Sequence, residues 1–485
     1  MHTQNSYFDQ AINFLNDIIW SPVFIAACII IGLYFTFRMS FLQVRFIPDM
    51  VKLLFKEGSN DKGVSPFQAF AIAIAGRVGT GNIAGVATAI GIGGPGAVFW
   101  MWIIAFFGSA TAFIEATLGQ IYKVEKDGEY KGGPAYYIEK GLGVKWYAVL
   151  FAVSTMIACV LFLPGVQSNS IADSMHNAFQ IDKIWVGVAV ALALGIIVIG
   201  GAKRIARFSE IVVPIMAGVY ILMAVVIVSL NFSEIPAVFS LIINSAFGAD
   251  ATFGGIVGSA VAMGVKRGIY SNEAGQGTAP HAAAAAATSH PAKQGLVQAF
   301  SVYIDTLFVC TATAFIILFS GQYNVADGNG GFIVESIPGV EHGAQFTQAA
   351  ISEFFPSVGN SFVAFALLFF AFTTAMAYYF IAESNLHYLS KKGVNSTILW
   401  LMRGLFFGST IYGAVSSGGT AWTLGDIGVG LMAWLNLIAI ILLRKPALKA
   451  FDDYKKQKKE GKDPVFNPKE LGIENTSEWS DDSNS

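Results

Sequence analysis

Charged residues are scarce in this chain. Of its 485 residues, 13% are Asp, Glu, Lys or Arg, whereas 54% are hydrophobic. A soluble globular chain carries about 25% charged residues. The formal net charge is −2, so the composition gives no indication of a nucleic-acid or strongly acidic partner. These shortages argue against a soluble globular protein and favour one that is embedded in a membrane.

Cysteine and histidine are also few. Cys28, Cys159 and Cys310 are far apart, and each lies within an apolar run. The six histidines form no cluster with cysteine or aspartate at metal-ligand spacing. An enzyme would need convergent nucleophiles, bases or metal ligands. We therefore predict that the chain is not an enzyme and that it needs no organic cofactor.

Positive charge is absent before the first apolar run. Residues 1–17 contain no Lys or Arg, whereas a secretory signal peptide begins with a positively charged segment. The run is also not followed by a small-residue cleavage site and a soluble domain. We therefore predict that residues 18–38 form a retained membrane helix.

Long apolar runs are what the chain has in excess. A helix needs about 20 mainly apolar residues to cross the hydrocarbon core of a bilayer. Eleven runs approach this length, at residues 18–38, 66–92, 96–120, 146–171, 185–200, 208–230, 254–288, 297–319, 359–386, 396–415 and 425–443. The predicted fold is therefore an all-α polytopic membrane protein with eleven transmembrane helices.

Lys and Arg are unevenly distributed among the connections between these runs. Cytoplasmic loops carry an excess of both residues. The odd-numbered connections contain Arg38, Arg45, Lys52, Lys56, Lys62, Lys123, Lys126, Lys131, Lys140, Lys203, Arg204, Arg207, Lys293, Lys391 and Lys392. The amino terminus and the even-numbered connections contain one, Lys183. The asymmetry predicts an inner-membrane protein with residues 1–17 outside the cytoplasm and a polar tail, residues 444–485, inside it.

Two of the runs are interrupted by glycines and charges. Arg77 precedes the sequence Val-Gly-Thr-Gly-Asn at residues 78–82, and Lys266 and Arg267 precede a polar, glycine-rich stretch at 271–277. Each glycine costs about 1 kcal/mol in a helix interior, and a charge at the bilayer centre costs about 2.5–3.5 kcal/mol or more. Such segments occur where a membrane helix is broken and its free backbone groups face a cavity or a ligand.

The two interruptions share a pattern. Arg77 is followed by Asn82, Ala84 and Gly85, and Arg267 is followed at the same offsets by Asn272, Ala274 and Gly275. The predicted topology gives the two segments opposite orientations, five spans apart. Inverted repeats produce this arrangement in secondary transporters. We therefore predict two repeats of five helices, residues 66–230 and 254–443, preceded by one extra helix.

A helix broken at the bilayer midplane offers two kinds of binding group. The amino end of a half-helix attracts a carboxylate, and free carbonyl groups coordinate a cation. The pattern therefore favours a carrier of a small amino acid together with Na⁺ or H⁺. A proton-coupled carrier of another small nitrogenous solute fits as well. A passive channel fits less well, because it would need a continuous polar path along the spans.

Several longer motifs carry a family resemblance. They are residues 78–85 (VGTGNIAG), 93–102 (GGPGAVFWMW), 131–137 (KGGPAYY), 266–275 (KRGIYSNEAG), 290–298 (HPAKQGLVQ) and 304–313 (IDTLFVCTAT). The chain, except for its tail, resembles the alanine or glycine:cation symporter family, also called sodium:alanine symporters. The resemblance implies a LeuT-type fold and sodium-coupled uptake of alanine, glycine or a similar small neutral amino acid across the cell membrane, with no obligate protein partner.

The resemblance also implies roles for individual residues. The positions that it assigns to the substrate are Thr80, Gly81, Asn82, Gln167, Ser271, Asn272 and Gly275. The positions that it assigns to Na⁺ are Thr373 and Thr374, through their hydroxyl groups, and Ala75 and Val78, through backbone carbonyls. Oxygen ligands alone suit a hard cation such as Na⁺.

This chain departs from the family pattern near the expected substrate. Tyr378 stands where the family usually has Trp, and Gln276 and Thr278 replace the more usual Leu and Ser. These changes add polar groups, and Tyr is smaller than Trp. We therefore expect Tyr378 and Gln276 to border a pocket that also accepts serine or a slightly larger neutral amino acid.

Overall fold

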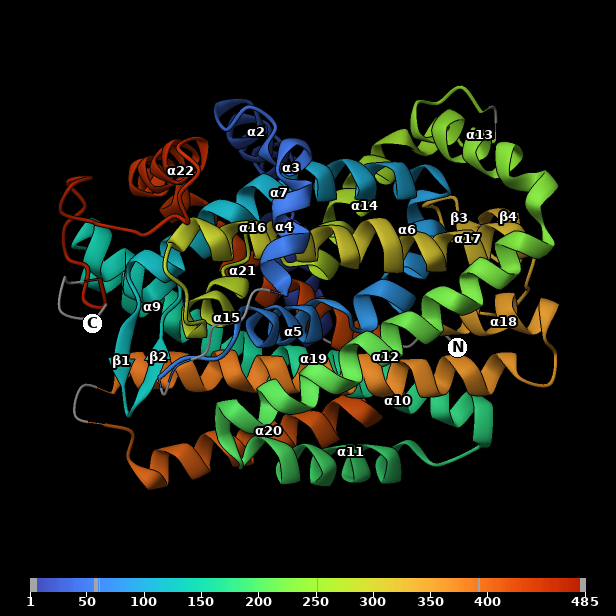
Figure 1. Cartoon of the computed structure of the whole chain (residues 1–485). Coiled ribbons are helices and arrows are strands. Elements are labelled where there is room, and N and C mark those ends of the chain that lie inside the picture. Colours follow the sequence, from blue (N-terminus) through green and yellow to red (C-terminus); the bar gives the residue numbers. More distant parts are fainter. Residues whose placement is uncertain (1–6, 56–59, 61, 251, 391–392, 480–485) are drawn as a thin grey trace.

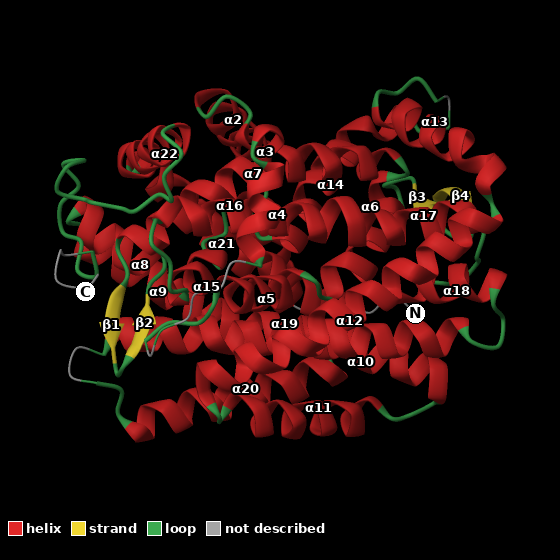
Figure 2. Ribbon diagram, viewed as in Figure 1, coloured by secondary structure: helices red, strands yellow, loops and turns green. Residues whose placement is uncertain are grey.

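The structure is a computed structural model of the whole chain, and it describes residues 7–55, 60, 62–250, 252–390 and 393–479. Helices make up nearly all of it (Figures 1 and 2). Two short antiparallel hairpins lie at opposite ends of the helix bundle, β1 (Val124–Lys126) with β2 (Glu129–Lys131) and β3 (Asn324–Ala326) with β4 (Phe332–Glu335). We use the hairpins to name the two ends of the molecule.

The helices of the first half are α1 (Tyr7–Ile19), α2 (Pro22–Arg38), α3 (Leu42–Arg45), α4 (Ile47–Leu54), α5 (Pro66–Arg77), η1 (Gly81–Gly85), α6 (Val86–Gly93), α7 (Gly96–Ile121), α8 (Pro134–Tyr137), η2 (Ile138–Leu142), α9 (Lys145–Ile157), η3 (Ala158–Phe162), α10 (Leu163–Phe179), α11 (Lys183–Val198), α12 (Gly201–Leu230), η4 (Phe232–Glu234) and α13 (Ile235–Ala246). Those of the second half are η5 (Gly254–Ile256), α14 (Val257–Asn272), α15 (Ala279–Ala285), α16 (Pro291–Val302), η6 (Tyr303–Cys310), α17 (Thr311–Ser320), α18 (Ala344–Phe354), α19 (Gly359–Leu389), α20 (Ser396–Val415), α21 (Gly418–Leu442) and α22 (Arg444–Lys459).

Eight helical stretches among the described residues are long and apolar enough to cross a membrane, and a bent pair formed by α5 and η1–α6 gives a ninth. All nine coincide with predicted spans. The other two predicted spans differ from a simple crossing helix. Residues 185–200 correspond to α11, which has 16 residues, and residues 254–288 contain α14 and α15, which are separated by a break. The first span begins earlier than predicted, because α1 already starts at Tyr7.

The first predicted break is confirmed. A capping box starts α5, in which the Ser65 hydroxyl accepts from the Gln68 amide and the Gln68 side chain accepts from the Ser65 amide. The helix ends at Arg77, and the chain continues after three residues into η1, a π-helix, and then into α6. The two parts meet at an angle of 50°. Short π-helical segments occur mostly at functional sites.

The second predicted break is confirmed as well. α14 ends at Asn272, and α15 begins only at Ala279. Glu273 follows α14 in the left-handed conformation, with φ of +56°, and Gly275 and Gly277 both have φ of +83°. Glycine adopts this conformation without a steric penalty, so the glycines of this stretch allow the chain to leave the helix between α14 and α15.

α7 lies beside the second break and packs against α14, α15 and α16. Small residues allow these helices to approach closely. A Cβ atom on Gly264 of α14 would lie 2.5 Å from the carbonyl oxygen of Ala97 in α7. The close contact fixes the α14 side of the break against α7, the helix that carries Glu115.

The predicted polar tail is largely folded in the described residues. α22 buries Leu448, Phe451 and Tyr454, and the segment after it returns to the β1–β2 end of the bundle. There the Phe466 amide donates to the carbonyl of Ser289 (2.9 Å), and the Trp479 indole donates to the carbonyl of Gln120 (3.0 Å). Residues 480–485, which the sequence also placed in the tail, lie outside the described residues, as do Lys56, Lys391 and Lys392.

Candidate functional site

Neutral side chains bind the free backbone amides at the first break. The Gly79 amide donates to Oδ1 of Asn82 (2.8 Å), and the Thr80 amide donates to Oε1 of Gln167, which comes from α10 (3.2 Å). All of these residues are buried. The Thr80 hydroxyl has no hydrogen-bond partner among the described residues. The structure thus brings Thr80, Asn82 and Gln167 together, three of the residues that the resemblance assigned to the substrate.

The two breaks meet at Gly81. A Cβ atom at this position would lie 3.1 Å from Cα of Ser271, the penultimate residue of α14. Residues of both interrupted helices therefore share one buried region, as the sequence predicted. Any side chain larger than hydrogen at Gly81 would push the two half-helices apart.

Thr374 faces the carbonyl groups at the end of α5. Its hydroxyl oxygen lies 2.8 Å from the Ala75 carbonyl oxygen and 3.4 Å from that of Val78. Three oxygen atoms from two helices thus converge beside the first break. Such a set of oxygen ligands suits a hard cation. These are three of the four residues that the resemblance assigned to Na⁺.

Thr373 lies apart from this group. Its hydroxyl donates to the Phe370 carbonyl within α19 (2.9 Å), and its other neighbour is the sulfur of Met216 in α12 (3.8 Å). Adjacent helix positions point in directions about 100° apart. The structure therefore places Thr373 on a different side of α19 from Thr374, and none of its hydrogen bonds reaches Ala75 or Val78.

Asp305 lies between the two breaks, although the sequence gave this residue no role. One carboxylate oxygen, Oδ1, accepts from the Asn82 amide group (2.6 Å) and from the Ser271 hydroxyl (3.1 Å). The other, Oδ2, accepts from the Thr306 hydroxyl (2.7 Å). Asp305 is fully buried. It takes part in no salt bridge within the part of the chain that the structure describes.

At the second break the amides are bound by a carboxylate instead. Glu115 of α7 accepts from the amides of Gly275 and Gly277, each at 3.1 Å and each through a different oxygen. Asn436 of α21 donates to Glu115 (2.7 Å) and to the Gly275 carbonyl (2.9 Å). Tyr137 in turn donates to Asn436. The Gly275 amide is thus already occupied in this structure.

Asn272 and Gln276, two other predicted residues of the second break, bind to the break itself, to the end of α14 and to η6. Asn272 accepts from the Ala274 amide (3.0 Å) and donates to Thr306 (3.3 Å). The Gln276 side chain donates to the Ile269 carbonyl near the end of α14. Asn272 and Gln276 therefore stabilise the conformation of the break. Gln276 and Tyr378 are not hydrogen-bonded to each other in this structure.

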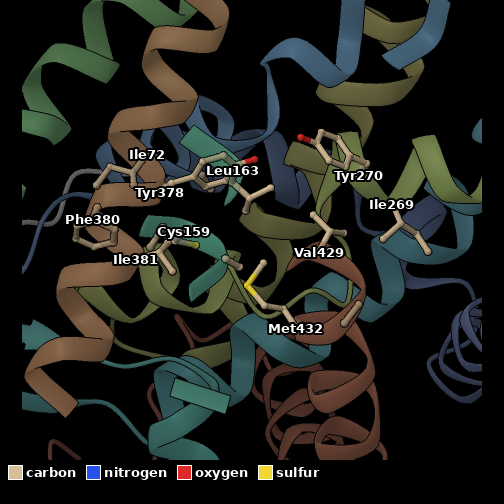
Figure 3. Close-up of a cluster of buried hydrophobic side chains, with 14 of the residues drawn as sticks. Ile72, Cys159, Leu163, Ile269, Tyr270, Tyr378, Phe380, Ile381, Val429 and Met432 are labelled. Atoms are coloured by element: carbon tan, nitrogen blue, oxygen red, sulfur yellow. The ribbon is translucent and has the colours of Figure 1, made fainter. Parts of the chain in front are cut away.

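Tyr378 lies in a buried hydrophobic cluster (Figure 3). It comes from α19, and its ring points toward Tyr270 of α14 across the side chain of Leu163. Tyr378 lies one helical turn after Thr374, so both occupy the same face of α19. Of the three polar departures from the family pattern, the structure places Tyr378 between the helices of the site, while Gln276 binds the end of α14 and Thr278 donates to Glu273 (2.9 Å).

Basic side chains near the breaks have acidic neighbours. Lys266 and Arg267 both pair with Asp426 of α21, at 2.7 and 2.6 Å. Arg77 donates to the Gln298 carbonyl (3.2 Å), and Glu273, Glu115 and Asp305 are the carboxylates whose charges act on it. Arg77 thus holds the end of α5 against α16.

A cavity of about 880 Å³ extends from the β3–β4 hairpin to η1, the π-helix that follows the first break. Its lining includes Phe332 of the hairpin, Arg267 of α14, and Ala84, which lies two residues beyond Asn82. Trp422, which Arg267 contacts in a cation–π interaction (4.7 Å), lines it as well. Ala84 is the lining residue that lies nearest to the first break in the sequence, and the residues of the break itself do not line the cavity.

The roles of Asp305 and Glu115 were not found from the sequence. Both are acids inside apolar runs, a signal that marks functional candidates in membrane segments. The sequence did not show their partners, because Glu115 and Gly275 are 160 residues apart and Asn82 and Asp305 are 223 apart. Only the packed helices bring them together.

The fold and the site define a polytopic membrane protein with discontinuous helices, of the kind found in secondary transporters. In the described residues no group of three or more His, Cys, Asp or Glu side chains could hold a metal ion. Residues 5–468 match the sodium:alanine symporter family, and the chain belongs to this family.

Individual relatives agree with this assignment. YrbD of Bacillus subtilis (strain 168) is 59% identical, over 96% of each chain. The sodium/proton-dependent alanine carrier protein of Bacillus sp. (strain PS3) is 52% identical, over 89% of this chain and 97% of the relative. A mutant of the manganese transporter of Eremococcus coleocola has a similar fold, with a TM-score of 0.52 and 14% identity, over 83% of this chain and 88% of the transporter.

Proposed function

We propose that this chain carries alanine, or a similarly small neutral amino acid, into the cell together with Na⁺. The observation that carries the proposal is the group of oxygen atoms from Thr374, Ala75 and Val78 beside the first break. A cation held there would contact the free carbonyl end of α5. The Bacillus sp. relative, which is named a sodium/proton-dependent alanine carrier, supports alanine as the substrate.

The substrate carboxylate would bind at the first break. Asn82 and Gln167 bind the amides there in the present structure, and both are neutral caps that a carboxylate can replace. The free hydroxyl of Thr80 offers one more donor. Gly81 and Ser271 would border the bound molecule, and Tyr378 would limit the size of its side chain. Asn272, Gly275 and Gln276 would shape the site indirectly by holding the second break.

The energy available to such a carrier can be estimated. One Na⁺ that enters down a membrane potential of about 100 mV gains roughly 2.3 kcal/mol. A tenfold concentration gradient of Na⁺ adds about 1.4 kcal/mol. The sum would sustain an accumulation of a zwitterionic amino acid of several hundredfold. H⁺ is the second candidate for the coupling ion, because the Bacillus sp. relative is named for both ions.

We further propose eleven spans in a LeuT-type arrangement of five plus five helices, with one extra helix before them. The two broken helices support the repeat, and the position of the basic connections supports an orientation with the β1–β2 end in the cytoplasm. A reporter fused to the carboxyl terminus should then report the cytoplasm. One inserted in loop 320–358 should report the outer side. The opposite result at either position would contradict the orientation.

Uptake into proteoliposomes tests the proposed function directly. Radiolabelled alanine should accumulate against its gradient when an inward Na⁺ gradient is imposed. Replacement of Na⁺ by K⁺ at constant ionic strength should abolish the accumulation, and an inward proton gradient in K⁺ buffer tests the alternative ion. Accumulation that follows the proton gradient alone would replace Na⁺ with H⁺ in the proposal. Transport without accumulation under either gradient would indicate a passive channel.

A further inference from the structure

The outer ends of the two broken helices are joined at the β1–β2 end of the molecule. The Val64 amide, just before α5, donates to the carbonyl of Ala285, the last residue of α15 (3.0 Å). The Ala287 amide donates in return to the Val64 carbonyl (2.9 Å). The β2 strand lies beside this bridge, because the Tyr130 amide donates to the Lys62 carbonyl (2.9 Å). At this end α5 and α15 can separate only if the two bonds of the bridge break.

Two side chains that follow α7 toward the β1–β2 hairpin bind the same end of α15. The Gln120 side chain donates to the carbonyls of Ala283 and Ala286, the latter at 2.9 Å. Lys123 also donates to the Ala286 carbonyl (3.2 Å), and its Nζ lies 4.1 Å from the ring centre of Tyr130. Both Gln120 and Lys123 are buried. The last carbonyls of a helix have no partner in a following turn, so these donors bind them and hold α15 against α7.

The carboxyl-terminal segment, residues 463–479, covers these two side chains. The Trp479 indole donates to the backbone carbonyl of Gln120 (3.0 Å), and its ring centre lies 4.8 Å from Nζ of Lys123. A lysine ammonium group is attracted to the face of an aromatic ring, and the attraction is larger where water is excluded. Trp479 therefore favours the position in which Lys123 binds Ala286.

The same segment is attached to the connection between α15 and α16. Lys293 of α16 pairs with Asp463 (2.6 Å). The Phe466 amide donates to the carbonyl of Ser289 (2.9 Å). The Phe466 ring packs edge-on against Trp479, with 5.1 Å between the ring centres. The segment thus contacts both the connection that follows α15 and the side chains that bind the end of α15.

We propose that residues 463–479 form a strap that keeps the two broken helices closed at the β1–β2 end, and that Trp479 is its positioning residue. The strap acts through Gln120 and Lys123, which it holds on the end of α15. Loosening of the strap shifts the equilibrium toward a form in which α15 has separated from α5. This proposal rests on the proposed function, because a carrier with alternating access has to open each end of its site in turn.

Hydrogen–deuterium exchange tests the strap at the bridge itself. Purified full-length protein and Trp479→Ala are compared by mass spectrometry of the peptides that contain Val64 and Ala287. A hydrogen-bonded amide exchanges when its bond opens locally. Both peptides should exchange about threefold to tenfold faster in Trp479→Ala. Trp479→Phe keeps a ring over Lys123 and loses only the donor to Gln120, so its exchange should lie between the two.

A second variant tests the route through Lys123. Lys123→Met removes the donor to the Ala286 carbonyl, so it should also speed exchange at the bridge. Because Trp479 acts partly through Lys123, the double variant should exchange more slowly than the product of the two single effects predicts. Single effects that multiply in full would overturn the role of Lys123 in the proposal.

Trp146→Ala is the matched control. Trp146, in the first turn of α9, is 72% exposed, and its ring packs against the neighbouring Tyr147. Its loss should leave exchange at the bridge unchanged. A peptide that contains β3, at the opposite end of the molecule, should exchange equally in all variants. This second control separates an opening of the β1–β2 end from a general loss of stability.

The outcomes distinguish the strap from the proposed function. Unchanged exchange at Val64 and Ala287 in Trp479→Ala would overturn the strap. Exchange that rises equally at the bridge and at β3 would overturn it too, since the segment would then stabilise the fold as a whole. Neither result bears on the coupling of alanine to a cation, which the proteoliposome experiment tests separately.

Discussion

The two broken helices look alike in sequence but are stabilised differently. At the first break, the amides of Gly79 and Thr80 are bound by the neutral side chains of Asn82 and Gln167. At the second, the amides of Gly275 and Gly277 are bound by the carboxylate of Glu115. Hydrogen bonds to a charged group are about twice as strong as those between neutral groups. We therefore propose that the first break exchanges its caps for a ligand, whereas the second stays bound by Glu115 of the protein itself.

This difference assigns the two breaks separate tasks. At the first break, a substrate carboxylate would replace neutral acceptors with a charged one, so the hydrogen bonds made by the backbone amides would become stronger. At the second break it would have to displace a carboxylate that is already bound by two amides and by Asn436. In this structure the second break is thus bound by a carboxylic side chain of the protein itself, and the two breaks differ in spite of their similar motifs.

The largest expected effect is the loss of the Glu115 carboxylate. In Glu115→Ala the amides of Gly275 and Gly277 lose their acceptors inside the membrane. Each unsatisfied group costs about 1–3 kcal/mol, so the unfolding temperature in detergent should fall clearly and transport should be lost. Glu115→Gln keeps one acceptor oxygen and should be intermediate. Unfolding temperatures of both variants that equal the original would show that the second break does not depend on Glu115.

The next effect concerns the cation at the first break. Thr374→Ala removes one of the three oxygen atoms beside α5 and should raise the half-maximal Na⁺ concentration for uptake about tenfold, which corresponds to about 1.4 kcal/mol. Thr373→Ala is the matched control, because its hydroxyl faces Met216 and the carbonyl of Phe370. Equal Na⁺ dependence in the two variants would contradict the assignment of Thr374 as the ligand.

The contrast between the breaks shows what the sequence could reveal. Both breaks were predicted, because glycines and charges inside an apolar run are unfavourable in an intact membrane helix. The positions at the first break were predicted through the family motif, and the structure brings Thr80, Asn82 and Gln167 together. The motif at the second break resembles the first, so the sequence assigned Gly275 to the substrate as well.

What the sequence could not reveal depends on helix packing and rotation. Glu115 reaches Gly275 only because α7 packs along α14 and α15, and no local pattern encodes that contact. The different environments of Thr373 and Thr374 depend on how α19 is rotated about its axis. The folded tail also escaped prediction, because the apolar residues of α22, such as Phe451 and Tyr454, are few among many charges.

A smaller effect should distinguish a substrate cap from a structural one. Gln167→Leu removes the acceptor of the Thr80 amide at the first break. If a substrate carboxylate takes over this amide, the variant should bind alanine about threefold to tenfold more tightly, because the amide is left unsatisfied only in the ligand-free form, while its unfolding temperature with bound alanine stays near the original. Asn436→Leu, at the second break, should instead lower the unfolding temperature. Affinity and stability that fall together in both variants would remove the distinction between the breaks.

The smallest expected effect concerns Tyr378, the residue that we propose limits the side chain of the substrate. Tyr378 and Tyr270 point toward one another across Leu163, in a region where every labelled side chain is tightly surrounded (Figure 3). Trp at position 378 would fill more of this space, so Tyr378→Trp should disfavour serine and larger amino acids relative to glycine and alanine. A difference of one methylene group changes discrimination by about 1–3 kcal/mol, and the shift should lie at the lower end of this range because Tyr already occupies most of the volume.

Tyr378→Phe is the control variant. It removes only the hydroxyl, so it separates the effect of polarity from the effect of size. Competition uptake with glycine, alanine, serine and threonine measures both variants. A ranking that changes in Tyr378→Phe but not in Tyr378→Trp would show that the hydroxyl, rather than the size of the ring, determines which side chains are accepted.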